Sequence, residues 1–143
     1  MNTAWIMGML VGMTWLGALE NTGFQPSSLK NTLAEKRDHR RVLVLFSRGD
    51  AQTAWGTLQT EKTGLAERDL DVLVFTDANL SDSDRRFLTQ NPFKLAPSDE
   101  FKGWLIGKDG GVKRTFVKPI NPNELFRLID SMPMRQAEMR KPQ

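Results

Sequence analysis

From residue 41 the chain reads Arg41-Val-Leu-Val-Leu-Phe-Ser-Arg-Gly-Asp-Ala-Gln-Thr-Ala54. The apolar run at its start is typical of a strand that is buried on both faces of a sheet. A polar turn follows, and Asp50 is a plausible N-cap for the helix after it. Because open parallel sheets bind ligands at the carboxyl ends of their strands, the loop from Ser47 to Ala54 is the first place to look for a site.

The downstream pattern extends this unit into an α/β domain. We expect a helix over 50–63, a strand over 70–76, a helix from Ser81 to before Pro92, strands over 101–106 and 112–117, and a helix from Asn121 to before Pro133. Two apolar strands joined by a helix form a parallel βαβ unit. The Asp-Gly pair between the last two strands predicts an antiparallel hairpin, with Asp109 and Gly110 in its turn. There we expect Gly110→Val to be destabilising and Lys108→Ala to be nearly neutral.

The segment before this domain has a different composition. Residues 1–19 carry no charged side chain and contain an apolar stretch of the length found in secretory signal peptides. We interpret them as a signal peptide, with an uncleaved membrane anchor and a buried N-terminal helix as open alternatives. Residues 20–40 read as a linker and a short helix capped by Ser27 or Ser28. The domain is expected over 41–143, in a periplasmic or secreted setting.

Composition excludes several classes of function. The 143 residues are 39% hydrophobic, enough for one domain, and the net charge of +3 comes from basic residues that are spread along the chain. We therefore expect no nucleic-acid partner. The complete absence of cysteine rules out disulfides, thiolate metal sites and thiol redox chemistry, so we expect no disulfide reductase or peroxidase activity. No residue pattern indicates a cofactor or a metal.

The loop after the first strand lacks a nucleophile with an evident base. It also lacks a glycine-rich phosphate cradle, and His39, the single histidine, is most simply a solvated residue. The candidate binding residues are Ser47, Arg48, Asp50, Lys102, Arg135 and Arg140.

Two functions remain open on these residues. The first is a non-enzymatic binding module of the cell envelope that contacts a protein or a small ligand, through the loop and a C-terminal segment in which methionines alternate with charged residues. Packing of Met132 and Met139 on the sheet edge, with the neighbouring charges in water, is the structural alternative for that segment. The second function is a thiol-independent enzyme with an acid–base pair of Asp50 and Lys102 across the loop.

The element order β-α-β-α-β-β-α resembles thioredoxin, which implies a three-layer α/β/α fold with a mixed central sheet and a C-terminal hairpin plus helix. On this comparison Ala51 and Ala54 fall on the two redox cysteines, and Lys102 on the cis-proline that faces them. The resemblance is therefore to the fold and not to the oxidoreductase.

A narrower resemblance covers most of the chain after the leader. It is carried by four segments, which are Arg41-Val-Leu-Val-Leu-Phe-Ser47, Leu65-Ala-Glu-Arg-Asp-Leu70, Leu105-Ile-Gly-Lys-Asp-Gly-Gly-Val-Lys113 and Leu125-Phe-Arg-Leu-Ile-Asp-Ser-Met-Pro-Met-Arg-Gln-Ala-Glu-Met-Arg140. These segments resemble the bacterial family called domain of unknown function 4174. That family is similar to a peroxiredoxin-like domain in some animal extracellular-matrix and sushi-repeat proteins. The resemblance implies a thioredoxin-like fold and an exported setting, with no established activity.

Overall fold

A computed structural model describes residues 27–141. The expected leader and most of the expected linker lie outside these residues. Within the described part, no helix has the length and apolarity needed to cross a membrane.

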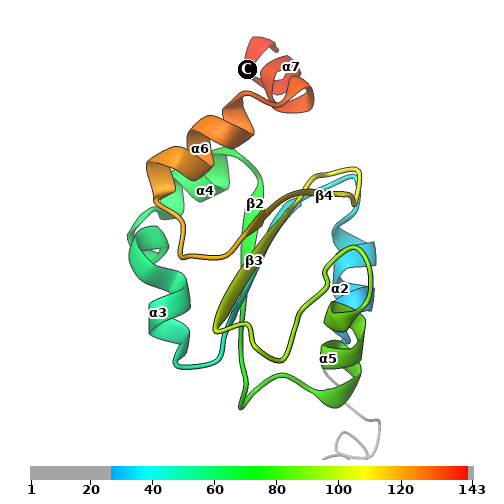
Figure 1. Cartoon of the computed structure of the whole chain (residues 1–143). Coiled ribbons are helices and arrows are strands. Elements are labelled where there is room, and N and C mark those ends of the chain that lie inside the picture. Colours follow the sequence, from blue (N-terminus) through cyan, green and yellow to red (C-terminus); the bar gives the residue numbers. More distant parts are fainter. Residues whose placement is uncertain (1–26, 142–143) are drawn as a thin grey trace, which may run out of the picture.

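The domain is built around a four-stranded mixed sheet (Figure 1). Its strands are β1 (Arg41–Ser47), β2 (Leu70–Thr76), β3 (Phe101–Ile106) and β4 (Val112–Phe116), in the order β2-β1-β3-β4. The central strand β1 pairs with β2 in parallel and with β3 antiparallel. All seven residues of β1 are buried, which explains why its sequence shows no alternation of apolar and polar residues.

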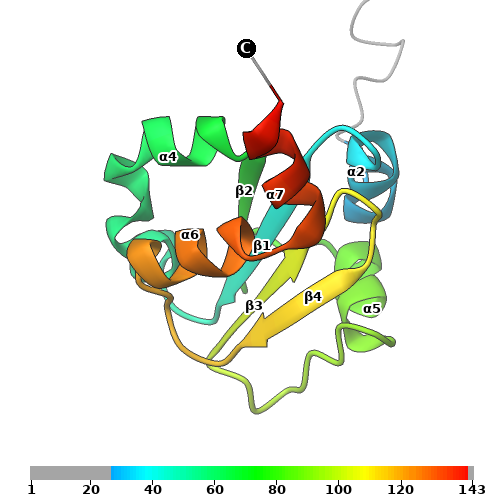
Figure 2. The same ribbon diagram turned by 90° about the horizontal axis from the view of Figure 1, so that it is seen from above.

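Helices cover both faces of the sheet, so the expected three-layer arrangement is confirmed (Figures 1 and 2). One face packs against α2 (Leu29–Lys36) and α5 (Asp82–Thr89) through a core that includes Val44 and Trp104. The other face packs against α3 (Ala51–Trp55), α4 (Lys62–Glu67) and α6 (Pro122–Asp130), through a core that includes Leu43 and Leu105. Successive strand residues thus point into opposite cores, as the pleat requires.

The expected helix over 50–63 is wrong in its length. Asp50 does cap α3, since its side chain accepts a hydrogen bond from the Thr53 amide at 2.7 Å. Gly56 then interrupts the helix with φ +52°, a left-handed conformation that favours glycine. A 3₁₀ turn, η1 (Gly56–Thr60), and the separate helix α4 follow.

The C-terminal segment contains a helix that the sequence analysis did not predict. Helix α6 ends at Asp130, before Pro133 as expected, but Pro133 then opens α7 (Pro133–Arg140). Proline is well tolerated at the first position of a helix because the amide there has no intrahelical partner. In Figures 1 and 2, α7 lies over the end of the sheet where β1 begins.

The β3–β4 turn confirms the role expected for Gly110, which has φ +85°. The Gly110 amide donates to the Gly107 carbonyl at 3.0 Å, and the Asp109 carboxylate accepts from the Gly111 amide at 3.0 Å. Lys108 has partners that the expectation for Lys108→Ala did not include, since its ammonium contacts Asp69 and Glu138.

Gly110→Val is expected to lower the free energy of unfolding by about 1 to 2 kcal/mol, since a β-branched residue is strained at positive φ. Denaturant titration is the measurement. Arg114→Ala, at an exposed position of β4, is the control and should change stability by less than about 0.5 kcal/mol. Equal midpoints for Gly110→Val and the parent would mean that the turn does not require this conformation.

Candidate functional site

The carboxyl end of β1 is where the sequence analysis placed its first candidates. Ser47 is buried at the end of the strand and is 4% exposed. Asp50 is exposed, and its carboxylate is used to cap α3; the hydrogen bond from Thr53 holds the pKa of Asp50 below its ordinary value. Neither residue is placed to activate a nucleophile.

Lys102 lies on the opposite face of the sheet from α3. It pairs with Phe46 in the β1–β3 register and alternates with Trp104, so it shares the face of the core that α2 and α5 cover. Its ammonium donates to the Lys94 carbonyl at 2.8 Å and lies 3.7 Å from Asp99. Asp50 caps a helix on the other face, so the structure does not form the acid–base pair that the enzyme hypothesis requires.

Arg48 connects the end of β1 to the loop before β3. Its guanidinium donates to the carbonyls of Asp99 and Pro97 at 3.1 and 2.7 Å. It also lies 3.6 Å from Asp77, which forms a shorter contact of 2.7 Å with Arg85. Arg48, Arg85 and Pro97 help to line a small pocket of about 170 Å³. Through these contacts Arg48 links the end of β1 to the loop before β3 and to the loop after β2.

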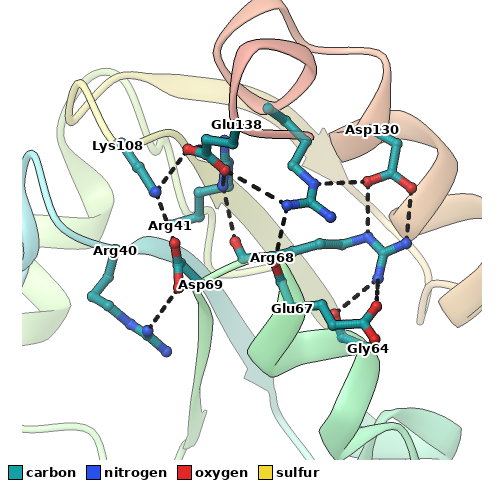
Figure 3. Close-up of polar contacts among 10 residues, drawn as sticks. Arg40, Arg41, Gly64, Glu67, Arg68, Asp69, Lys108, Asp130 and Glu138 are labelled. Carbon is teal, nitrogen blue, oxygen red and sulfur yellow. Dashed lines mark hydrogen bonds and ion pairs between the residues drawn. The ribbon is translucent and has the colours of Figure 1, made fainter. Parts of the chain in front are cut away.

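The opposite end of the sheet holds a network of charged side chains (Figure 3). At its centre is Arg41, the first residue of β1, whose side chain is only 2% exposed. Its two terminal nitrogens each donate to one carboxylate oxygen of Glu138 on α7, at 3.2 Å, and one of them also donates to the Arg68 carbonyl at 2.9 Å. A buried guanidinium needs such partners because an unpaired buried charge is very costly.

Further ion pairs surround this contact. Lys108 donates to Glu138 at 2.7 Å and to Asp69 at 2.9 Å. Arg135 donates to Asp130 at 3.1 Å and lies 3.7 Å from Glu138. The structure thus turns Arg135 and Glu138 toward the protein, and the expectation that these charges lie in water is wrong.

A second bidentate pair joins α4 to α6. The Arg68 guanidinium donates to both carboxylate oxygens of Asp130, at 3.0 and 2.8 Å. It also stacks over the Phe126 ring, 4.2 Å from the ring centroid. Arg135 shares Asp130 with Arg68, so α4, α6 and α7 are linked through one carboxylate.

Hydrogen bonds in this network shift the pKa of its acids. Partial burial would raise the pKa of Glu138, but the hydrogen bonds from Lys108 and Arg41 outweigh it and hold the pKa below its ordinary value. Burial is likewise outweighed at Asp130 by hydrogen bonds from Arg68 and Arg135, which lower its pKa. Each lowered pKa means that the folded state favours the ionised carboxylate.

We therefore expect the domain to lose stability as the pH falls below about 4.3, the ordinary pKa of a glutamate. A carboxylate whose pKa is lower in the folded state stabilises it fully above the unfolded-state pKa, and loses this contribution as the pH falls through the folded-state pKa. Urea titrations between pH 7 and pH 3 measure the effect, and Glu138→Gln should flatten it. A free energy of unfolding that stays constant over this range would contradict the ionic description of the network.

An open pocket of about 350 Å³ lies between α7 and the β3–β4 turn. We call it the α7 groove; it is lined by Arg41, Gly107, Lys108, Asp109, Lys113, Met132, Pro133 and Met134. Met132 is half-buried against the core below it, as expected, whereas Met139 is 48% exposed and does not pack on the sheet edge.

The last sequence candidate, Arg140, is exposed at the end of α7. The structure gives its side chain no ion pair or hydrogen bond among residues 27–141. The same described range contains no group of three or more potential metal ligands.

Sequence reasoning missed Arg41, Lys108 and Glu138. Arg41 and Glu138 are 97 positions apart, so no local spacing connects them. The one available signal was a charged residue directly before a fully apolar strand, which must be either solvated or paired. Arg135 was found, but as a surface residue.

Solved structures similar to this chain have the thioredoxin-like fold. A reduced 2-Cys peroxiredoxin of Plasmodium vivax matches with TM-score 0.56 and 14% identity, covering 76% of this chain and 72% of that one. A mitochondrial 2-Cys peroxiredoxin of Plasmodium falciparum matches with TM-score 0.51 and 12% identity, covering 78% and 86%. A DsbF homologue of Corynebacterium diphtheriae has TM-score 0.42 and 15% identity, covering 70% and 76%. At these identities the likeness extends to the fold alone.

No curated protein matches the chain. A family model does match, and it spans residues 32–138, from within α2 to within α7. This range contains the whole sheet, the charged network and the α7 groove. The chain therefore belongs to the family described as Domain of unknown function (DUF4174).

Proposed function

We propose that this protein is an exported, non-catalytic binding module, and that the α7 groove is its binding surface. The observation that carries the proposal is the lining of the groove, which combines methionine side chains with cationic groups. Methionine suits a binding wall because its unbranched, polarisable side chain adapts to different ligands. The groove is formed by the hairpin turn and by α7, two segments that lie at the end of the sheet where β1 begins.

The residues near the carboxyl end of β1 provide a second argument for placing the binding surface at the groove. Asp50 and Lys102 lie on opposite faces, Ser47 is buried, and Arg48 is bound to two carbonyls. The groove lies at the other end of β1, about 20 Å away for a strand of this length. On this proposal the ligand therefore binds at the α7 groove and does not contact the loop from Ser47 to Ala54.

Two methionines of α7 provide a matched test. Met134 is 49% exposed and lines the groove, whereas Met139 is 48% exposed and lies outside it. We expect the uncharged fluorescent probe N-phenyl-1-naphthylamine to bind the purified chain. Met134→Gln should weaken this binding at least threefold, and Met139→Gln should change it less than 1.5-fold. Equal weakening by both variants, or by neither, would show that the groove is not the binding surface.

Export is part of the same proposal and has its own test. Its support is the uncharged run of residues 1–19, with a stretch of signal-peptide length inside it. We expect the mature protein to begin close to Leu19 and to be recovered outside the cytoplasm. Mass spectrometry of protein extracted from cells measures the N-terminus. An intact Met1 in a soluble cytoplasmic fraction would contradict export without affecting the groove.

A further inference from the structure

We infer that the α7 groove takes a small molecule that carries a carboxylate on an apolar body, and that Glu138 competes with this carboxylate from inside the protein. The inference rests on the proposed function, because it names the ligand class of the same groove. Three observations support it: the charge of the lining, its apolar wall, and the contacts of Glu138.

The lining favours an anion. Three of its eight residues are cationic, namely Arg41, Lys108 and Lys113, and Asp109 is the one acidic member. Asp109 is turned toward Lys113, with 2.6 Å between the carboxylate and the ammonium. Arg41 and Lys108 are the other two cations, and both already contact Glu138, so a ligand anion would gain from them by taking the place of that carboxylate.

The part of the lining that precedes and begins α7 is apolar. Met132, Pro133 and Met134 form it, and half-exposed Met134 leaves apolar surface open to solvent. A ligand that is only an anion would leave this surface in contact with water. An aliphatic or aromatic body attached to the anion would cover it, with a gain of about 25 cal/mol for each Å² removed from water.

Glu138 shows which anion the cationic groups accept. Its two oxygens take one hydrogen bond each from Arg41, and Lys108 adds a third. This is the planar, two-point geometry by which guanidinium groups bind carboxylates. The structure thus already holds a carboxylate beside the groove, supplied by α7.

The helix that supplies Glu138 is held mainly by charge. No residue of α7 is fully buried, and the inward contacts of the helix come from Arg135 and Glu138. A helix docked in this way gives up little buried apolar surface when one ion pair is exchanged. A ligand carboxylate can therefore take the place of the Glu138 carboxylate on Arg41 and Lys108.

The test uses three six-carbon probes that differ only in their head group: hexanoate, hexanol and hexylammonium. The chain is labelled with ¹³C at its methionine methyl groups, and NMR titration follows Met132 and Met134. We expect hexanoate to bind at least fivefold more tightly than hexanol, and hexylammonium not to bind. Glu138→Gln should tighten hexanoate binding about tenfold and leave hexanol unchanged. The control Glu67→Gln, at a side chain that is 61% exposed, should change neither.

Two surface variants keep the test decisive if Glu138→Gln does not fold. Asp109→Asn should tighten hexanoate binding about threefold, and Lys113→Gln should weaken it by a similar factor. If hexanoate and hexanol bind the groove equally, the ligand class is wrong and the proposed function stands. If neither probe shifts Met132 or Met134 and N-phenyl-1-naphthylamine also fails to bind, the proposed function itself is wrong. Unchanged hexanoate binding in folded Glu138→Gln would overturn the role of Glu138 as a competitor.

Discussion

Glu138→Ala is expected to lower the free energy of unfolding by about 3 kcal/mol, at the lower end of the cost of breaking a buried ion pair. The variant leaves the Arg41 guanidinium, which is 2% exposed, without its bidentate partner. It also removes one of the two carboxylates that Lys108 contacts. We expect a cost at the lower end of this range because Glu138 is itself partly exposed. Water can therefore reach the space that the missing carboxylate leaves beside Arg41.

Glu67→Ala is the control for this prediction. The Glu67 carboxylate lies 3.8 Å from Arg68 and is 61% exposed, so its loss should cost less than about 0.5 kcal/mol. Urea titration at pH 7 measures both variants. If they lost the same stability, Arg41 would not depend on α7 for its charge compensation, and the network would be a set of independent surface pairs.

Gly64→Val should destabilise the domain by about 2 to 3 kcal/mol, near the upper end of the cost of overpacking. A Cβ atom at Gly64 would lie 2.5 Å from the Phe126 ring, which is closer than real Cβ contacts allow. The ring cannot move freely because the Arg68 guanidinium stacks on it. Helix α4 therefore needs glycine here to approach α6.

A double-mutant cycle tests this explanation. Phe126→Ala should remove at least about 1 kcal/mol of the cost of Gly64→Val, because the two side chains then no longer compete for space. Gly56→Val is the control: no atom lies within 4 Å of its Cβ position, so its strain at positive φ should not respond to Phe126→Ala. A Gly64→Val cost that is the same in both backgrounds would contradict the close packing of α4 on α6.

Local sequence patterns were enough to predict the sheet. The uninterrupted apolar run of β1 indicated a central strand, and the Asp109-Gly110 pair indicated the hairpin. The caps at Asp50 and Ser81 were also predictable, because each depends on residues within one turn. All of these features are determined over a few neighbouring positions.

The features that could not be predicted from the sequence depend on backbone conformation and on contacts between residues far apart in the chain. Gly56 could have been a tolerated helix residue, and only its φ of +52° makes it a break. Pro133 indicates the end of one helix, but proline is equally suited to begin the next, as it does at α7. The C-terminal methionines were predicted as part of a binding surface, but the contact of Arg41 with Glu138 was not, because it forms only once the whole domain has folded.

The candidates at the loop illustrate the limit of analogy. Asp50 and Lys102 were placed across from each other by alignment with thioredoxin. The structure separates them, because Lys102 alternates with Trp104 along β3 and so lies on the face of the sheet that α2 and α5 cover. A shift of one residue along a strand is enough to move a side chain to the other face of the sheet.

The most direct test of the binding surface is a map of backbone amide shifts for the whole domain. ¹⁵N-labelled protein is titrated with hexanoate and, separately, with hexanol, and every assigned amide is followed. We expect saturable shifts at Arg41, at residues 107–113 and at residues 132–138 of the segment that carries Glu138, with none from Ser47 to Ala54. Saturable shifts in the loop from Ser47 to Ala54, with no shifts in the α7 groove, would contradict the proposed binding surface. They would indicate instead a binding site at the carboxyl end of β1.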